Sequence, residues 1–125
     1  ANILHAVEAD QRLRDSGIRA YAVHPGTVAT SLARHMSRSD FSQLRRYAVA
    51  GSAARGESTT GHFDFTTPEN GAATQVWAAV SPELTDRGGL YLENCAVSET
   101  VAPYACDPER AAALWALSEK ICTTP

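Results

Sequence analysis

The stretch IRAYAVHPG, at residues 18–26, decides the fold of this 125-residue chain. Its first seven residues are apolar or aromatic apart from Arg19 and His24, which is typical of a short strand buried on both faces of a parallel sheet. Pro25 and Gly26 end such a strand, because proline has no N–H for the sheet ladder and glycine permits a tight turn. We therefore expect a strand over residues 18–24 and a loop directly after it.

A helix is expected before this strand. Residues 1–16 repeat apolar side chains near one face, among them Ile3, Leu4 and Val7, and Gly17 suits a left-handed C-terminal cap. The sequence opens directly on residues typical of a helix interior, with neither a methionine nor a capping residue before them. We therefore expect the helix, and the protein, to have begun further upstream.

Two more helices and a second strand are expected in the C-terminal half. The sequences TPE at residues 67–69 and DPE at residues 107–109 each combine a capping side chain, a proline at the first helical position and an acid in the first turn. The first helix should end near residue 81, and a strand should follow at residues 90–93. On the last helix, Leu114, Leu117 and Ile121 are expected on one face.

The segment of residues 37–66 is the least regular part of the sequence. It contains a possible helix at residues 41–50, followed by a glycine- and serine-rich stretch at residues 51–58 that is expected to be flexible. No repeat or linker divides the chain, so we expect one domain over residues 1–125.

The order helix, strand, loop, helix, strand, helix defines an α/β fold. Alternation of this kind is typical of a doubly wound parallel sheet, in which helices connect neighbouring strands through right-handed crossovers. Two parallel strands with flanking helices do not complete such a sheet, so the predicted fold is incomplete on its own.

Composition excludes several function classes. A net charge of -3 without a basic stripe disfavours nucleic acid and anionic membranes, and no apolar run reaches the roughly 20 residues of a membrane span. The three cysteines, four histidines and their spacing match neither a disulfide framework nor a metal site. A soluble, cytoplasmic protein with free, buried or half-buried thiols is expected.

Five short motifs occur along the chain: HPGTVAT at residues 24–30, PENGAAT at 68–74, SPEL at 81–84, GLYLENC at 89–95 and LWALSE at 114–119. Together they resemble the short-chain dehydrogenase/reductase family, in particular its retinol-dehydrogenase-like and WW-domain-oxidoreductase-like branch. Each motif alone is weak, but all occur in the family's order and spacing over nearly the whole chain; only residues 37–66 depart, where the family itself varies.

The resemblance implies that this chain is the C-terminal portion of a Rossmann-type domain and carries part of a site for NAD or NADP. It assigns the nicotinamide end of the cofactor to Pro25, Gly26, Val28 and Thr30, with backbone groups near Val28 and the Thr30 hydroxyl as ligands. The alternative is a plain turn at Pro25 and Gly26, with Thr30 capping the helix that follows. Residues 31–66 correspond to a variable substrate lid, or otherwise to a surface excursion.

Two parts of the family's machinery are absent from the sequence. There is neither a Gly-rich turn for the pyrophosphate nor a Tyr-x-x-x-Lys for proton transfer, and Lys120 is the sole lysine. No catalytic residue is assigned, and the chain alone is expected to be inactive. The parent protein is expected to exchange hydride between the cofactor and a small apolar alcohol or carbonyl compound.

A non-catalytic function is the alternative interpretation. A free-standing module derived from this fold would serve in binding or dimerisation. Relatives in the family often associate through the helices that correspond to residues 1–16 and 67–81, so a homo-oligomer is compatible with either interpretation.

Overall fold

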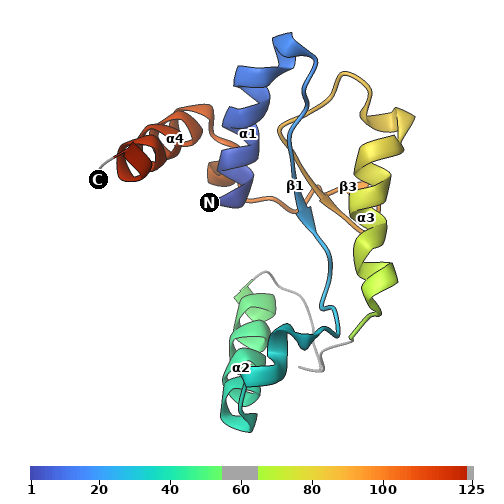
Figure 1. The fold of residues 1–125 in the computed structure, drawn as a ribbon. Coiled ribbons are helices and arrows are strands. Elements are labelled where there is room, and N and C mark those ends of the chain that lie inside the picture. The colour runs from blue at the N-terminus through green and yellow to red at the C-terminus, as the bar shows by residue number, and fades with distance from the viewer. Residues whose placement is uncertain (55–64, 124–125) are drawn as a thin grey trace. The chain divides into compact units, whose positions relative to one another are not determined.

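The computed structural model of the chain describes residues 1–54 and 65–123. The chain forms two compact units, which are described separately (Figure 1). The first, here called the sheet unit, comprises Ala1–Pro25 and Ala72–Pro125, and the second, the loop unit, comprises Gly26–Gly71.

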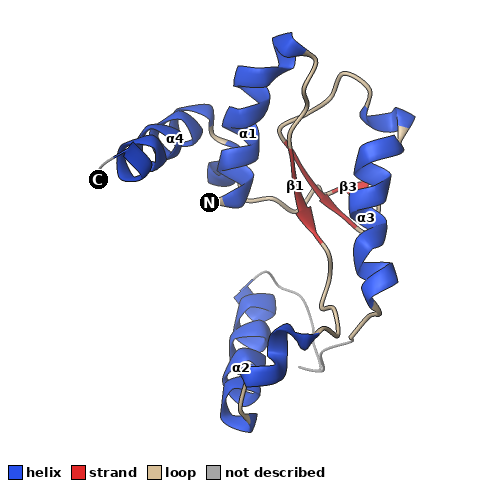
Figure 2. Ribbon diagram, viewed as in Figure 1, coloured by secondary structure: helices blue, strands red, loops and turns tan. Residues whose placement is uncertain are grey.

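The sheet unit is built around two parallel strands (Figure 2). Strand β1, Tyr21–His24, pairs with β2, Leu90–Glu93, so that His24 is the register partner of Glu93. The α/β class and the parallel pair agree with the sequence prediction, although β1 begins three residues later than expected. Residues 18–20 instead lead into the strand, and the Ala20 carbonyl accepts a hydrogen bond from the Gly89 N–H at 2.8 Å.

A third strand, β3, is a finding that the sequence did not predict. It comprises only Ala96–Val97 and lies antiparallel to β2, which gives the order β1-β2-β3. Asn94 and Cys95 connect the two strands with φ values of 51° and 54°. Two left-handed residues make the tight hairpin turn that Asn-Gly normally marks, and cysteine in the second position hides this signal.

Three helices flank the sheet or lead into it. Helix α1, Asn2–Leu13, continues as a 3-10 turn and ends at Gly17 with a φ of 75°, as the sequence predicted. Helix α3 is Pro68–Val80, and its Asn70 N–H donates to the Thr67 hydroxyl at 3.3 Å. Helix α4 is Pro108–Thr123. Both capping signals therefore begin helices where they were expected.

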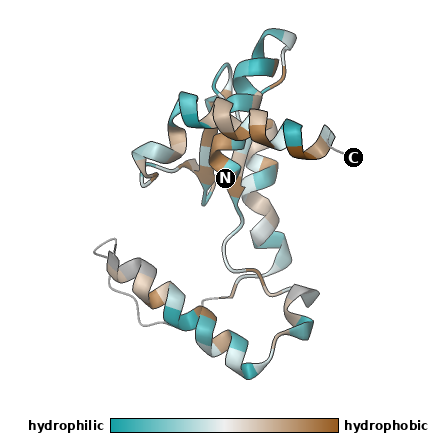
Figure 3. Ribbon diagram, turned by 90° about the vertical axis from the view of Figure 1, so that its left-hand side faces the viewer, coloured by the Kyte–Doolittle hydropathy of each residue, from teal (hydrophilic) through white to brown (hydrophobic). Residues whose placement is uncertain are grey.

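Helix α4 packs against α1. Ala111 is fully buried and Leu114 is partly buried, whereas Leu117 and Ile121 are 54% and 65% exposed. The buried face therefore follows residues 111, 114, 115 and 118, and of the three residues expected to share a face only Leu114 belongs to it. Hydrophobic and hydrophilic residues alternate along α4 (Figure 3), so its composition alone admits more than one apolar face.

Aromatic and charged side chains complete this helix contact. The Trp115 ring stacks on His5 with a centroid separation of 4.8 Å, and the Arg12 guanidinium lies 4.9 Å from the Trp115 centroid. Arg12 also donates from Nε to the buried Glu8 carboxylate at 2.7 Å. These contacts define the rotation of α4 about its axis more closely than a stripe of alanines and leucines does.

A buried carboxylate ties α1 to the segment that leads into β1. Asp10 accepts the Ala20 N–H at 3.1 Å and the Arg19 guanidinium at 2.8 Å. Gly88 lies so close that a Cβ atom there would collide with the Asp10 carboxylate.

Cys95, Cys106 and Cys122 are free and exposed, so the prediction of free thiols is confirmed and that of their burial is wrong.

The loop unit contains a 3-10 turn at Ser31–His35 and helix α2, Arg38–Ala54. Helix α2 is longer than predicted at both ends. Residues 51–54, predicted to be flexible, belong to this helix, and residues 55–58 lie outside the described residues. Ser37 and Asp40 form a reciprocal cap at its start: the Ser37 N–H donates to the Asp40 carboxylate at 2.7 Å, and the Asp40 N–H donates to the Ser37 hydroxyl at 3.3 Å.

Candidate functional site

The loop that the sequence assigned to a cofactor leaves the carboxyl end of β1. Gly26 has a φ of 78°, a conformation that glycine adopts at little cost and other residues rarely adopt. The chain turns there without the Cβ atom that would narrow the approach of a ligand to the backbone. Loops of this kind bind ligands in open α/β sheets, because they lie outside the carboxyl ends of the strands.

Two hydrogen bonds hold the middle of this loop. The Thr66 N–H donates to the Thr27 carbonyl at 2.9 Å, and the Ala29 N–H donates to the Thr66 carbonyl at 3.0 Å. Together they form a single parallel bridge between Val28 and Thr66. No sequence pattern predicts this contact, since Thr66 lies 38 positions beyond Val28 in the chain.

The bridge determines where the backbone of Val28 points. In a parallel pairing the residues on either side of the bridged one make the hydrogen bonds, so the N–H and C=O of Val28 itself face away from Thr66. Within the described residues neither group makes a backbone hydrogen bond. A donor and an acceptor held side by side match a carboxamide, which presents an N–H₂ donor and a C=O acceptor.

The remaining predicted ligand, Thr30, has an exposed side chain. It directly precedes the 3-10 turn at Ser31–His35, which is also the position of a capping residue. Pro25, Gly26 and Val28 precede it on the same loop. The position of Thr30 in the chain is thus compatible with either role, cofactor ligand or cap.

A polar cluster that the sequence did not predict lies at the end of β2. The Ser98 hydroxyl donates to the Glu93 carboxylate at 2.6 Å, and Glu93 is the register partner of His24. Burial raises the pKa of Tyr91 above its ordinary value, and the Glu93 carboxylate raises it further. The signal for this cluster in the sequence is Glu93, a charged residue at the last position of an otherwise apolar strand.

Two hollows in the described residues are large enough to be considered as ligand sites. One, of about 500 Å³, lies in the sheet unit between the start of α1, strand β1 and the side chains of Tyr91 and Tyr104. The other, of about 480 Å³, lies on α2 and is lined by Ser42, Arg45, Arg46, Val49, Ala50 and Ala53.

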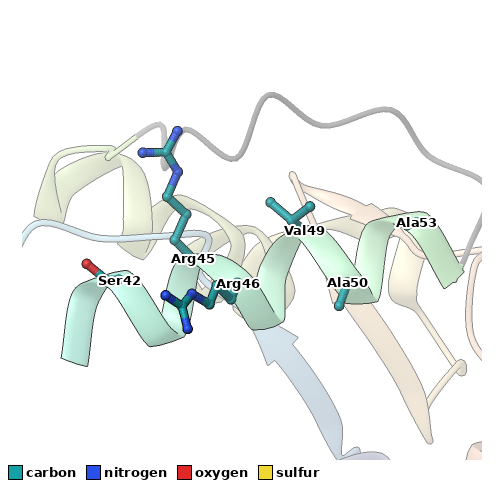
Figure 4. Close-up of a pocket in the computed structure, with 6 residues that line it drawn as sticks. All are labelled: Ser42, Arg45, Arg46, Val49, Ala50 and Ala53. Atoms are coloured by element: carbon teal, nitrogen blue, oxygen red, sulfur yellow. The ribbon is translucent and has the colours of Figure 1, made fainter. Parts of the chain in front are cut away.

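The hollow on α2 does not form a convergent polar site. The side chains of Arg45 and Arg46 extend to different sides of the helix (Figure 4), so their guanidinium groups do not meet around one anion. Val49, Ala50 and Ala53 supply an apolar surface beside them. The residues that line this hollow therefore do not form an anion-binding site by themselves.

The described residues contain neither a metal-binding cluster nor a membrane span. Across residues 1–54 and 65–123 no three His, Cys, Asp or Glu side chains gather as metal ligands would. Among the helices of these residues, none combines the length and the apolar character required to cross a bilayer.

Comparison with known proteins gives relatives but no family model and no solved structure. No family model matches the chain. No solved structure matches it either. A short-chain dehydrogenase/reductase of Penicillium roqueforti is 31% identical over 124 residues, which cover 91% of this chain and 33% of the relative. The human WW domain-containing oxidoreductase is 33% identical, with 96% of this chain and 25% of the relative covered, and human retinol dehydrogenase 14 is 32% identical, with 95% and 32% covered.

These relatives share one family, and the chain aligns with them over more than nine-tenths of its length. The α/β architecture with its parallel strand pair agrees with that family. The chain belongs to the short-chain dehydrogenases/reductases. It spans a quarter to a third of the length of the curated relatives it matches.

Proposed function

We propose that this chain is part of an NAD- or NADP-dependent oxidoreductase and that the loop from Pro25 to Thr30 holds the nicotinamide end of the cofactor. The observation that supports it is the bridge between Val28 and Thr66, which turns the N–H and C=O of Val28 away from the protein's own hydrogen bonds. A preorganised donor and acceptor bind a carboxamide without the cost of ordering a flexible loop.

The residues of the loop would act as orienting groups. The cofactor supplies hydride chemistry when bound. Val28 would hydrogen-bond the carboxamide through its backbone, Gly26 would allow close approach, and Thr30 would donate to the carboxamide or pyrophosphate. Fixing the carboxamide fixes the rotation of the nicotinamide ring, and thus the face that it presents to a substrate.

Proton transfer needs residues that this sequence does not contain. It has no Tyr-x-x-x-Lys and no Gly-rich turn, so the 125 residues by themselves would lack both the general acid and most of the cofactor contacts. We expect no turnover of NADH or NADPH by the purified chain with a panel of aldehydes. Measurable turnover would contradict the assignment of catalysis to residues outside this sequence.

The substrate is proposed to be a small apolar alcohol or carbonyl compound. Support comes from the relatives, one of which is named a retinol dehydrogenase. Residues 31–66, of which 55–64 lie outside the described residues, are proposed as the variable lid over the substrate, and the apolar surface of α2 at Val49, Ala50 and Ala53 is compatible with such a role.

An NMR titration tests the proposal directly. Nicotinamide mononucleotide, NAD⁺ and NADP⁺ are added separately to the ¹⁵N-labelled chain, because weak binding still shifts amide resonances. We expect the largest shifts at Gly26, Val28 and Thr30 with each nucleotide, and none with ribose 5-phosphate, which lacks the nicotinamide. Shifts confined to other regions, or absent at millimolar nucleotide, would overturn the proposal.

A binding or dimerisation module is the second candidate function. It is favoured by apolar side chains left exposed on α3 and α4: Val76 is 60%, Val80 73%, Leu117 54% and Ile121 65% exposed. Such a module would show no nucleotide-induced shifts and would form a stable, cooperatively unfolding oligomer. The same titration separates the two candidates.

A further inference from the structure

We infer that Gly71 and Thr66 are positioning residues for the nicotinamide-binding loop, and that they act together through Val28. The inference rests on the proposed function and extends it to residues that need not touch the cofactor. Gly71 leaves the space that the Val28 side chain occupies, and Thr66 holds the backbone on both sides of Val28.

Steric exclusion explains why residue 71 is a glycine. A Cβ atom there would lie 2.5 Å from Val28 Cγ2, closer than real Cβ contacts come, and 3.1 Å from Cγ1, tighter than most of them. Gly71 is buried and lies in the first turn of α3, with no positive φ that would itself require glycine. A glycine lowers the stability of a helix relative to alanine, so its presence here needs a packing reason. That reason is the Val28 side chain.

Thr66 provides the second restraint. Its N–H and C=O bond to Thr27 and Ala29, the two neighbours of Val28. Its methyl group would also be 3.9 Å from a Cβ atom on Gly26, so it lies beside the turn that starts the loop. Thr66 immediately precedes the cap of α3, Thr67, which places both restraints at the start of one helix.

The two restraints act on opposite parts of the same residue. Val28 packs its side chain against α3 and has its neighbours bound to Thr66, and its own N–H and C=O face the other way. A shift of Val28 away from residue 71 would therefore move the carboxamide-binding groups with it. The start of α3 sets the position of these groups, although none of its residues needs to contact the cofactor.

A pair of substitutions tests the steric part of this inference. Gly71→Ala should displace Val28 and break the bridge, which raises amide exchange at Ala29 and Thr66 by about tenfold or more through local opening. Adding Val28→Ala removes the two Cγ atoms and should restore slow exchange. Ala72→Val, an enlargement at the neighbouring exposed position, should change neither amide, and Leu92 in β2 should exchange equally slowly in every variant.

Helix propensity alone predicts a different pattern. It would make Gly71→Ala a stabilising change in α3 and would make Val28→Ala irrelevant to it. Unchanged exchange at Ala29 and Thr66 in Gly71→Ala, or faster exchange that Val28→Ala does not reverse, would overturn the inference.

The cofactor role is tested in the same variants with nicotinamide mononucleotide. We expect Gly71→Ala to weaken its binding about tenfold, as the loss of an oriented donor and acceptor would, and the double variant to recover most of that loss. Binding that is unchanged in Gly71→Ala overturns the positioning role. A wild-type chain that binds no nicotinamide mononucleotide overturns the proposed function itself. In that case the amide exchange data still show whether Gly71 positions Val28.

Discussion

Thr30 is the residue at which the two interpretations of the loop differ most. As a cofactor ligand it would lose a hydrogen bond in Thr30→Ala, and nicotinamide nucleotides should bind about 1–2 kcal/mol more weakly, the usual cost of leaving a polar partner unsatisfied. The measurement is a titration of the nucleotide into the labelled chain. Thr27→Ala is the matched control, since Thr27 takes part in the bridge through its carbonyl and not its side chain.

The capping interpretation makes the opposite prediction for the same substitution. Loss of a cap would destabilise the turn at Ser31–His35 and leave the nucleotide dissociation constant unchanged. An unchanged dissociation constant together with faster amide exchange in that turn would therefore remove Thr30 from the proposed site.

Asp10 is the single residue with the clearest role in stability. Asp10→Ala would leave the Ala20 N–H and the partly buried Arg19 guanidinium without their acceptor, so we expect a loss of about 2–3 kcal/mol in the free energy of unfolding. Urea denaturation measures it. Asp15→Ala is the control, because Asp15 has a 96% exposed side chain 4.0 Å from Arg14 and should change stability little. Equal midpoints for the two variants would contradict this account.

Residue-level prediction from the sequence succeeded where the reason was local. Gly17 and Gly26 were expected to permit turns, and both have positive φ values. The reasons for Gly71 and Gly88 could not be predicted, because the atoms that exclude a Cβ belong to Val28 and Asp10, which are distant in sequence. The same holds for the outward direction of the Val28 backbone, which depends on its bridge to Thr66.

Among the elements, α2 provides a pH-dependent feature. Hydrogen bonds from the Ser37 backbone and side chain hold the pKa of Asp40 below its ordinary value. A carboxyl group whose pKa is lowered on folding stabilises the helix above the ordinary pKa of Asp, and this contribution is lost as the pH falls through the lowered value. We therefore expect the start of α2 to fray as the pH falls below about 4.

Carboxyl ¹³C NMR of Asp40, together with amide exchange in the first turn of α2, measures this effect. Asp40→Asn is the control, since the amide keeps an acceptor for the Ser37 N–H but does not titrate over this range. The amides in the first turn of Asp40→Asn should show the same protection factors, relative to intrinsic exchange at each pH, at both ends of the pH range. Fraying at low pH that is equal in Asp40→Asn and wild type would assign the effect to other carboxyl groups.

Capping signals predicted the elements better than hydrophobic patterns did. The caps at Thr67 and Asp107 begin α3 and α4 at the expected residues. Strand β3 was missed because two residues are too short for an alternating pattern, and the buried face of α4 could not be predicted because many of its residues are small or apolar. Tertiary contacts such as the stacking of Trp115 on His5 determine which face of α4 is buried.

At the scale of the whole sheet, β1 is an edge strand. In the part of the chain that the structure describes, it pairs with β2 alone. Hollows of about 500 and 320 Å³ adjoin it, both lined in part by α1 and by Ala22 and Val23. Unpaired backbone groups on an apolar strand favour pairing with another strand, whether it belongs to the same protein or to a second chain.

The bare edge of β1 predicts that the 125-residue chain associates in solution. Sedimentation should show a concentration-dependent rise in mass, with slower amide exchange in β1 as it occurs. Val23→Lys places a charge on this edge and should suppress the association. Val97→Lys is its counterpart on β3, whose two residues offer little to pair with, and should leave association intact. A wild-type chain that stays monomeric and melts cooperatively above about 60 °C, the upper part of the range for mesophile domains, would show that β1 needs no partner and that α1 and the three strands form a sufficient core.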